Sequence, residues 1–167
     1  MLIESLTPRG KKWFLLLSLL GLVVCLDQAT KVYVHNTFVL HESRPVIAAF
    51  FHLTYVRNPG AAFGFLANRQ EAFLHFFFPL VTLLAIVVLL VYFIRVPRQR
   101  TLTLWGIGLI IGGAVGNGID RLWLGQVIDF LDFHWNTYHW PAFNVADSAI
   151  CVGVGLLLFD AFRHSPT

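Results

Sequence analysis

Four long apolar stretches constrain the fold of this chain more than any other feature of its sequence. A helix needs about 20 apolar residues to cross the hydrocarbon core of a bilayer. The second and third stretches reach this length without a charged residue, and the first reaches it if the helix continues past Asp27. The fourth contains Asp147 near its beginning. We therefore expect four transmembrane helices, over residues 12–30, 72–94, 101–120 and 141–162.

The composition excludes a soluble protein and a disordered chain. Hydrophobic residues make up 57% of the 167 residues and charged residues 13%, against about 25% charged in ordinary soluble domains. No segment is polar enough to form a separate soluble domain. No small-residue cleavage site follows the first apolar stretch, so we do not expect it to be a cleaved signal peptide. The sequence predicts a mainly α-helical membrane protein with a single integral domain, residues 1–167.

The positions of lysine and arginine predict the orientation in the membrane. Seven of the twelve basic residues lie in the N-terminal tail, the link at residues 95–100 and the C-terminus, together with only two acidic residues. The other side holds five basic and seven acidic residues. Because short cytoplasmic loops carry an excess of Lys and Arg, we expect both termini in the cytoplasm. These charges are not gathered on one polar element, so no nucleic-acid partner is expected.

Two outer segments, residues 35–70 and 122–140, are too apolar to be free loops. Strand-forming residues fill positions 46–56 and end at a turn signal, residues 58–60, which predicts a small strand-rich element between the first and second helices. The second segment carries aromatic residues typical of a membrane–water interface: Trp123, Trp135, Tyr138 and Trp140. The sequence therefore predicts a strand-rich element that rests on the outer leaflet.

Carboxylates near the membrane are the main candidates for chemistry, because ionisable groups are costly there. Asp147 lies in the fourth apolar stretch, and Asp129 lies between apolar residues in a segment that returns to the same outer end. Two carboxyl groups brought together in a low-dielectric site share a proton, so that one acts as acid and the other as base. This is the chemistry of an aspartic protease. Membrane depth alone does not select this pair over Asp27 or Asp120.

The same carboxylates are also consistent with structural roles. Asp147 near a helix start can simply complement the helix dipole. Asp120 and Arg121 can form a terminal ion pair or an interface anchor, and Asp132 can be a solvated neighbour of Asp129. A different class of function is a small ion- or proton-translocating protein that uses intramembrane carboxylates. The seven histidines show no metal-ligand spacing, and Cys25 and Cys151 lie in apolar runs, so we expect neither a metal site nor a disulfide.

Five segments, taken together and in order, resemble the lipoprotein signal peptidase (signal peptidase II) family, bacterial inner-membrane aspartic proteases. They are Asp27–Lys31, Asn58–Gly64, Gly112–Arg121, Val127–Phe130 and Phe143–Asp147. Each motif alone is weak, whereas their order along a four-span chain is specific. One residue departs from the family pattern: Gly118 stands where a larger apolar residue is more usual, so we expect different packing at that helix end.

The resemblance implies that Asp129 and Asp147 are the catalytic pair. It implies that the enzyme removes the signal peptide of a diacylglyceryl-modified prolipoprotein, cutting just before the lipidated cysteine. The other polar residues of the motifs fall into two groups. Residues that hold substrate or support the pair are Asn58, Asn117, Arg121 and Asn144, and structural polar residues are Asp27, Lys31 and Asp120.

The resemblance also implies the setting of the reaction. It implies no metal or organic cofactor, and we expect a monomer surrounded by membrane lipids, with the active site near the outer face of the inner membrane. Family members are inhibited by cyclic peptide antibiotics such as globomycin, so the resemblance implies the same sensitivity here.

Overall fold

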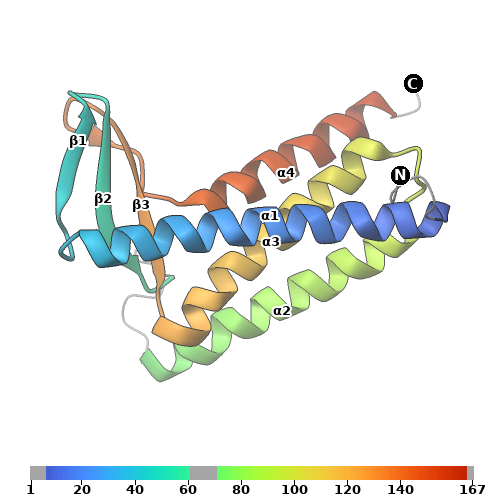
Figure 1. Ribbon diagram of the computed structural model, residues 1–167, viewed down its shortest axis with the longest axis horizontal. Helices are drawn as coiled ribbons and strands as arrows, with labels where there is room; N and C mark the ends of the chain where they lie inside the picture. The colour runs from blue at the N-terminus through green and yellow to red at the C-terminus, as the bar shows by residue number, and fades with distance from the viewer. Residues whose placement is uncertain (1–6, 61–70, 165–167) are drawn as a thin grey trace.

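The computed structural model of the protein describes residues 7–60 and 71–164. The elements follow one another along the chain as α1 (Pro8–Thr37), β1 (Ser43–Ile47), β2 (Phe51–Asn58), α2 (Glu71–Arg95), α3 (Thr101–Leu124), β3 (Val127–Trp135), β4 (Tyr138–His139) and α4 (Val145–Arg163). In the described part of the chain four helices are long and apolar enough to cross a membrane, as expected. Figure 1 shows the strands at one end of the helical bundle, with the start of α1 and the end of α4 at the other.

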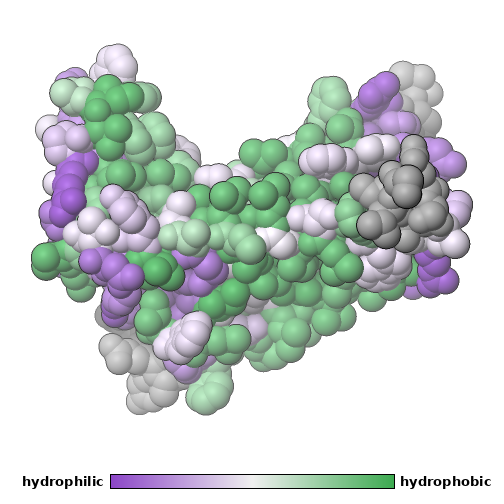
Figure 2. Space-filling model, in the orientation of Figure 1, coloured by the Kyte–Doolittle hydropathy of each residue, from purple (hydrophilic) through white to green (hydrophobic). Residues whose placement is uncertain are grey.

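The surface of the bundle matches a bilayer rather than water. Large apolar side chains point outward along the helices; Phe76, for example, is 77% exposed and Val88 66%. Figure 2 shows an apolar band over the middle of the visible face and hydrophilic residues toward the two ends. Exposed apolar surface of this extent is costly in water but favourable against lipid tails. The chain is therefore a multi-pass membrane protein.

Helix α3 lies in the centre of the bundle and packs against α1, α2 and α4. Its glycines allow this close packing: a Cβ at Gly108 or Gly112 would collide with α1, and one at Gly113 would lie 2.3 Å from a backbone oxygen of α4. Small residues at helix contacts in membranes let backbones approach closely. Gly118 is different, because a Cβ there would meet only Thr82, at an ordinary 3.5 Å. Gly118 is one of the residues that line a groove of about 200 Å³ between α2 and α3.

The strands form one antiparallel arrangement in the order β1-β2-β3-β4. The predicted strand run at residues 46–56 is not a single strand, because residues 48–50 turn and β2 pairs back onto β1. β3 and β4 come from the second outer segment, for which the sequence predicted only interfacial aromatics. The strand-rich element therefore joins both outer segments, which are separated in the chain by α2 and α3.

A small apolar core fixes this sheet to the end of α1. Val34 and Phe38 of the α1 region pack with Tyr55 of β2 and with Ile128 and Phe130 of β3, and all five side chains are buried. The hydroxyl of Tyr55 also lies 2.7 Å from a ring nitrogen of His35. The sheet is thus held at a fixed position over the bundle by buried apolar contacts.

Two helix boundaries differ from the sequence prediction. The first helix ends at Thr37 and not near residue 30, because Lys31 is paired inside the bundle and so does not mark the end of the buried helix. The fourth helix begins at Val145 and not near Pro141. Residues before it are extended because Phe143 pairs with Leu131 of β3. Asp147 consequently lies in the first turn of α4 rather than deeper along the helix.

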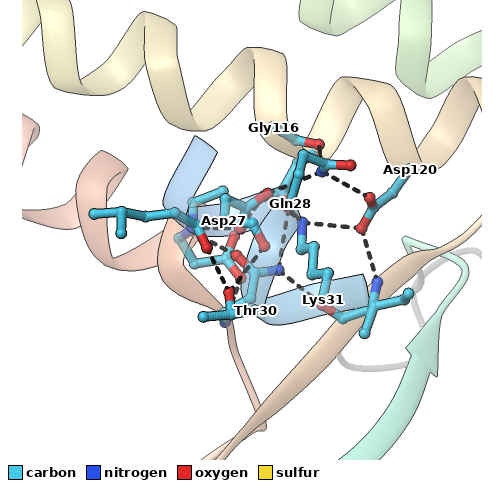
Figure 3. A network of polar contacts seen from close by, with 12 residues as sticks. Asp27, Gln28, Thr30, Lys31, Gly116 and Asp120 are labelled. Carbon is cyan, nitrogen blue, oxygen red and sulfur yellow. Dashed lines mark hydrogen bonds and ion pairs between the residues drawn. The ribbon is translucent and has the colours of Figure 1, made fainter. Parts of the chain in front are cut away.

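A buried ion cluster joins α1 to α3 (Figure 3). The ammonium group of Lys31 lies 2.8 Å from a carboxylate oxygen of Asp27 and 2.9 Å from one of Asp120, and it donates a third bond to Asn117 Oδ1 at 2.9 Å. The Lys31 and Asp27 side chains are almost completely buried. The predicted terminal ion pair between Asp120 and Arg121 is therefore wrong, since Asp120 pairs with α1. Neighbouring residues of a helix point in different directions, so Arg121 does not share this partner.

Gln28 completes the cluster, although the sequence did not mark it as a candidate residue. Its amide group donates to Asp120 Oδ1 at 3.1 Å and to the carbonyl oxygen of Gly116 at 3.1 Å. A Cβ on Gly116 would lie 2.6 Å from a carboxylate oxygen of Asp27, so only glycine fits at this crossing. Each polar group placed in this cluster thus has a partner, which buried charges require.

Gly153 of α4 provides a test of the close helix packing. A Cβ at this position would lie 2.6 Å from the carbonyl oxygen of Gly106, whereas nothing lies within 4 Å of a Cβ at Gly155 on the same helix. We expect Gly153→Ala to destabilise the fold by about 1–3 kcal/mol. Gly155→Ala, the matched control, is expected to be neutral or slightly stabilising. Thermal denaturation in detergent measures both, and equal melting temperatures would contradict the packing described above.

Lys31 provides a test of the buried cluster. Lys31→Met leaves two buried carboxylates without their counter-ion, so we expect a loss of about 3–5 kcal/mol in the free energy of unfolding. Arg44 forms an ion pair with Glu42 at the surface, with 49% of its side chain exposed. Arg44→Gln should therefore change the free energy of unfolding much less than Lys31→Met does. Denaturant titration of the two variants compares them, and similar losses would show that the cluster adds no special stability.

Candidate active site

Asp129 and Asp147 come from different elements and meet where the sheet joins the bundle. Asp129 is on β3, and Asp147 lies in the first turn of α4. The chain leaves β3, turns at β4 and returns, so that Phe143 exchanges backbone hydrogen bonds with Leu131. This return brings the start of α4 beside β3. The two aspartates singled out by the sequence are thereby placed around one residue, Asn144.

Asn144 is completely buried and contacts both carboxylates. Its side-chain amide donates to Asp129 Oδ1 at 2.8 Å, and its backbone N–H donates to Asp147 Oδ2 at 3.2 Å. Its side-chain oxygen accepts a bond from the backbone N–H of Asp147 at 2.9 Å, which completes a capping box at the start of α4. Asp147 therefore has the structural role that the sequence left open, since it lies at the N-terminus of a helix and takes part in its capping. The same bonds also fix its position relative to Asp129.

Two further asparagines supply the remaining bonds. Asn117 of α3 donates to Asp147 Oδ1 at 2.7 Å, and Asn58 at the end of β2 donates to Asp129 Oδ2 at 3.1 Å. Each of the four carboxylate oxygens of the pair thus receives a hydrogen bond from an amide N–H. These donors are neutral, so they orient the carboxylates without forming an ion pair with them.

A β-bulge places Asn58 on the correct face of the sheet. The pairing of β2 with β3 shifts between Leu53 and Val56, where β2 contains one extra residue. As a result Asn58, and not Arg57, lies on the same face as Asp129. Arg57 instead donates to the hydroxyl of Tyr55 at 3.0 Å on the other face. The next motif residues, 61–64, lie outside the described residues.

The buried ion cluster also contacts the backbone beside each aspartate. Asp120 Oδ2 accepts a bond from the N–H of Ile128 at 3.0 Å, and Asp27 Oδ1 accepts one from the N–H of Ala146 at 2.9 Å. Ile128 and Ala146 immediately precede Asp129 and Asp147 in the chain. Asp27, Asp120 and Lys31, predicted to be structural, thus belong to the same connected network as the pair.

The two carboxyl groups differ in their surroundings. Asp129 is 3% exposed, whereas Asp147 is only partly buried. Burial raises the pKa of Asp129 to about 7; the negative charge of Asp147 acts in the same direction, and the hydrogen bonds from Asn58 and Asn144 oppose the shift. Asp129 therefore keeps a proton close to neutral pH.

Arg121 brings a positive charge to this site from outside the ion cluster. It lies in the last turn of α3, where its charge acts on Asp147, Asp129 and Asp120. Its guanidinium carbon lies 5.2 Å from the centre of the Phe78 ring, and its buried Nε has no hydrogen-bond partner among the described residues. Arg121 thus offers an unused donor beside the pair.

The remaining candidate residues lie apart from the pair. Asp132 is not a solvated neighbour of Asp129: it is 8% exposed and binds His139 at 2.9 Å. Being three residues along β3 from Asp129, it lies on the opposite face of the sheet. Cys25 and Cys151 are free and exposed on helix surfaces. In the described ranges, no group of three His, Cys, Asp or Glu side chains is arranged to hold a metal ion.

The sequence of this chain matches known proteins over nearly its whole length. A family model described as signal peptidase (SPase) II matches residues 19–163. The lipoprotein signal peptidase of Syntrophus aciditrophicus is 50% identical over 153 residues, which cover 92% of this chain and 95% of the relative. That of Geobacter sulfurreducens is 53% identical over 139 residues, covering 83% and 86%.

The fold is similar to solved structures as well. A bacterial membrane enzyme determined by the in meso method at 1.9 Å resolution superposes with a TM-score of 0.78 at 31% identity, covering 90% of this chain and 94% of that one. A second such structure, at 2.3 Å, gives a TM-score of 0.77 at 33% identity, covering 91% and 92%. By the family model, the relatives and the fold, this chain belongs to the signal peptidase II family of peptidases.

Proposed function

We propose that this protein is an aspartic endopeptidase that removes the signal peptide from diacylglyceryl-modified prolipoproteins, cutting just before the lipidated cysteine. The observation that carries the proposal is the pair Asp129 and Asp147, with an amide N–H donor on each carboxylate oxygen and one member buried enough to keep a proton. The name of the relatives, lipoprotein signal peptidase, supports the substrate class.

The first step of the proposed reaction uses the difference between the two carboxyl groups. Asp147, the more exposed member, accepts a proton from a water molecule as that water attacks the carbonyl carbon of the scissile peptide bond. Asp129 donates its proton to the carbonyl oxygen, so no free oxyanion forms. The product of this step is a tetrahedral diol. Asp129 is then ionised, and Asp147 carries the proton taken from water.

The second step returns the pair to its starting state. Asp147 transfers its proton to the nitrogen of the leaving amine, and the carbon–nitrogen bond breaks. Asp129 recovers a proton from a hydroxyl of the diol as the new carboxyl group forms. The products are the signal peptide and a lipoprotein whose cysteine has a free α-amino group. The asparagine amides around the pair do not exchange protons, so the transfers stay between the two carboxyl groups and the substrate.

The position of the pair suits a substrate held in the membrane. Asp129 and Asp147 lie where the bundle meets the sheet, so the apolar signal helix can enter from the bilayer while the lipid chains stay in the leaflet. In this proposal Arg121 holds the substrate backbone with the N–H that has no partner among the described residues, and Asn58 and Asn117 keep the pair oriented. The sheet lies at the outer face of the inner membrane and both termini are cytoplasmic, in line with the positive-inside rule.

Ion or proton transport, the alternative from the sequence, has less support from the geometry. A relay needs titratable groups spaced through the membrane. In the described helices the buried carboxylates gather at the end beside the sheet, except Asp160, which lies near the end of α4. We further expect, from the family resemblance, a monomer inhibited by globomycin.

Replacement of either aspartate tests the catalytic assignment. Asp129→Asn and Asp147→Asn keep the size and shape of the side chain but replace one carboxylate oxygen by an NH2 group, which removes the transferable proton or the base. We expect each to lower the cleavage rate of a diacylglyceryl-modified prolipoprotein at least about 10³-fold. The measurement is the initial rate in detergent, with the unlipidated precursor, which the wild type should not cut, as a second substrate.

Asp132→Asn is the matched control for this experiment. It changes a buried carboxylate on the same strand but on the other face, so cleavage should continue near the wild-type rate. Circular dichroism and melting temperature establish that all three variants fold. Full cleavage by a folded Asp129→Asn or Asp147→Asn protein would rule out the proposed mechanism.

The raised pKa of Asp129 predicts the pH dependence of cleavage. The reaction needs the proton on Asp129, whose pKa is about 7. We therefore expect kcat/KM to fall about tenfold per pH unit above this value. Rates measured from pH 5 to 9 on a lipidated peptide test this, with Asp132→Asn as the control that keeps the same profile. An unchanged rate up to pH 9 would show that Asp129 is not the acid.

The same shift predicts how stability changes with pH. The carboxyl of Asp129 has an ordinary pKa of 3.8, so between about pH 4 and 7 the folded chain holds a proton that the unfolded chain has lost. The contribution of this group to stability is complete below pH 4 and is lost as pH rises through 7. Asp129→Asn has no titrating carboxyl at this position, so it does not show this loss of stability with rising pH. The melting temperature of Asp129→Asn relative to that of the wild type should therefore rise from pH 4 to pH 8. A difference in melting temperature that stays constant with pH would contradict the raised pKa of Asp129.

A further inference from the structure

A second polar site lies at the end of the bundle that catalysis does not use. A groove of about 640 Å³ is formed where α2, α3 and α4 come together. Its lining includes Arg95 at the end of α2, Arg100 just before α3, and Leu157 and Leu158 of α4. Figure 1 shows the link between α2 and α3 and the end of α4 at the bundle end opposite the sheet. The volume is in the range of small-molecule binding sites.

The polar part of this groove is cationic. Arg95 is exposed, Arg100 is 36% exposed, and no acidic residue is among the described residues that line the groove. The nearest carboxylate, Asp160, is 2% exposed and accepts bonds from Thr103 and Arg100. Asp160 therefore holds one edge of the Arg100 guanidinium in place. The planar guanidinium has five N–H donors, so most of them stay available to a ligand.

The remaining walls of the groove are apolar and continue into the membrane-facing surface. Tyr92 lines the groove on α2, and Val88 lies one turn further into the membrane on the same face of α2. Leu158 and Val154 have the same relationship on α4. All four side chains are exposed, by 42–66%. A ligand with an anionic head and long apolar chains fits both parts.

We propose that this groove binds an anionic phospholipid, with its phosphate between Arg95 and Arg100 and its acyl chains along α2 and α4. A small soluble anion would use the arginines but leave the apolar walls unfilled. A zwitterionic lipid would bring its own cation toward the two arginines. Basic pockets between helices at a membrane surface are known to favour anionic headgroups. The site does not include Asp129 or Asp147, so its test is independent of the test of the proposed reaction.

Lipid titration of the purified protein tests the site. Native mass spectrometry in detergent compares dioleoylphosphatidylglycerol with dioleoylphosphatidylcholine. We expect the wild type to bind one phosphatidylglycerol more tightly than phosphatidylcholine, and Arg95→Gln to weaken that binding about fivefold. Arg98→Gln, in the same link but not lining the groove, is the matched control and should bind as the wild type does. Arg95→Gln should cleave substrate at the wild-type rate in lipid-free detergent.

Arg100→Gln is the second variant, because Arg100 also contacts Asp160 and its loss can lower stability. A fivefold weakening of phosphatidylglycerol binding in folded Arg100→Gln protein supports the site. If Arg100→Gln does not fold, the result with Arg95→Gln alone tests the proposal. Equal binding of the two lipids, unchanged binding by Arg95→Gln, or an equal loss in Arg98→Gln would each overturn the proposal. The last result would show only a general attraction between lipids and a basic membrane edge.

Discussion

The rest of the structure depends on the buried ion cluster around Lys31. One ammonium group compensates two carboxylates, and each carboxylate uses a remaining lone pair to hold a backbone N–H that directly precedes an aspartate of the pair. Removing charges from water costs several kcal/mol per ion, so such a cluster is stable only when every partner is in place. Its geometry is correspondingly strict. The strand that carries Asp129 and the helix that begins before Asp147 are both fixed by it.

The difference between the two carboxyl groups follows from the elements that carry them. Asp147 lies in the first turn of a helix, where backbone N–H groups and the helix dipole stabilise a negative charge. Asp129 lies on a strand, which has no such field, and it is buried against the bundle. Burial raises the pKa of Asp129 more than the nearby charge of Lys31 lowers it, so the protonated form is favoured. In the proposed mechanism, a strand and a helix start thus provide an acid and a base from two chemically identical side chains.

The sequence predicted those parts of the fold that depend on local composition. Long apolar stretches locate the helices, and the family motifs contain every residue of the network, although Gln28 was not marked as a candidate residue. The sequence did not predict contacts between residues that are far apart in the chain. Asp120 is next to Arg121 in the chain but binds Lys31, 89 residues away in the sequence. Pro141 suits a helix start, yet pairing of Phe143 with β3 delays the helix to Val145. The bulge that places Asn58 rather than Arg57 on the face of Asp129 cannot be predicted from the sequence of β2 alone. Strand register depends on both strands of a pair.

The asparagines explain how a strongly charged network can lie beside a pair that exchanges protons in the proposed mechanism. Lys31 does not contact Asp147 directly; it donates to Asn117, which in turn donates to Asp147. A direct ion pair with a lysine would stabilise the ionised carboxylate and make it a weaker base. A histidine in place of Asn117 would offer a competing site for the proton. A neutral amide transmits orientation but neither gives up nor takes a proton, so the cluster fixes the position of Asp147 and leaves it free to act as the base in the proposed reaction.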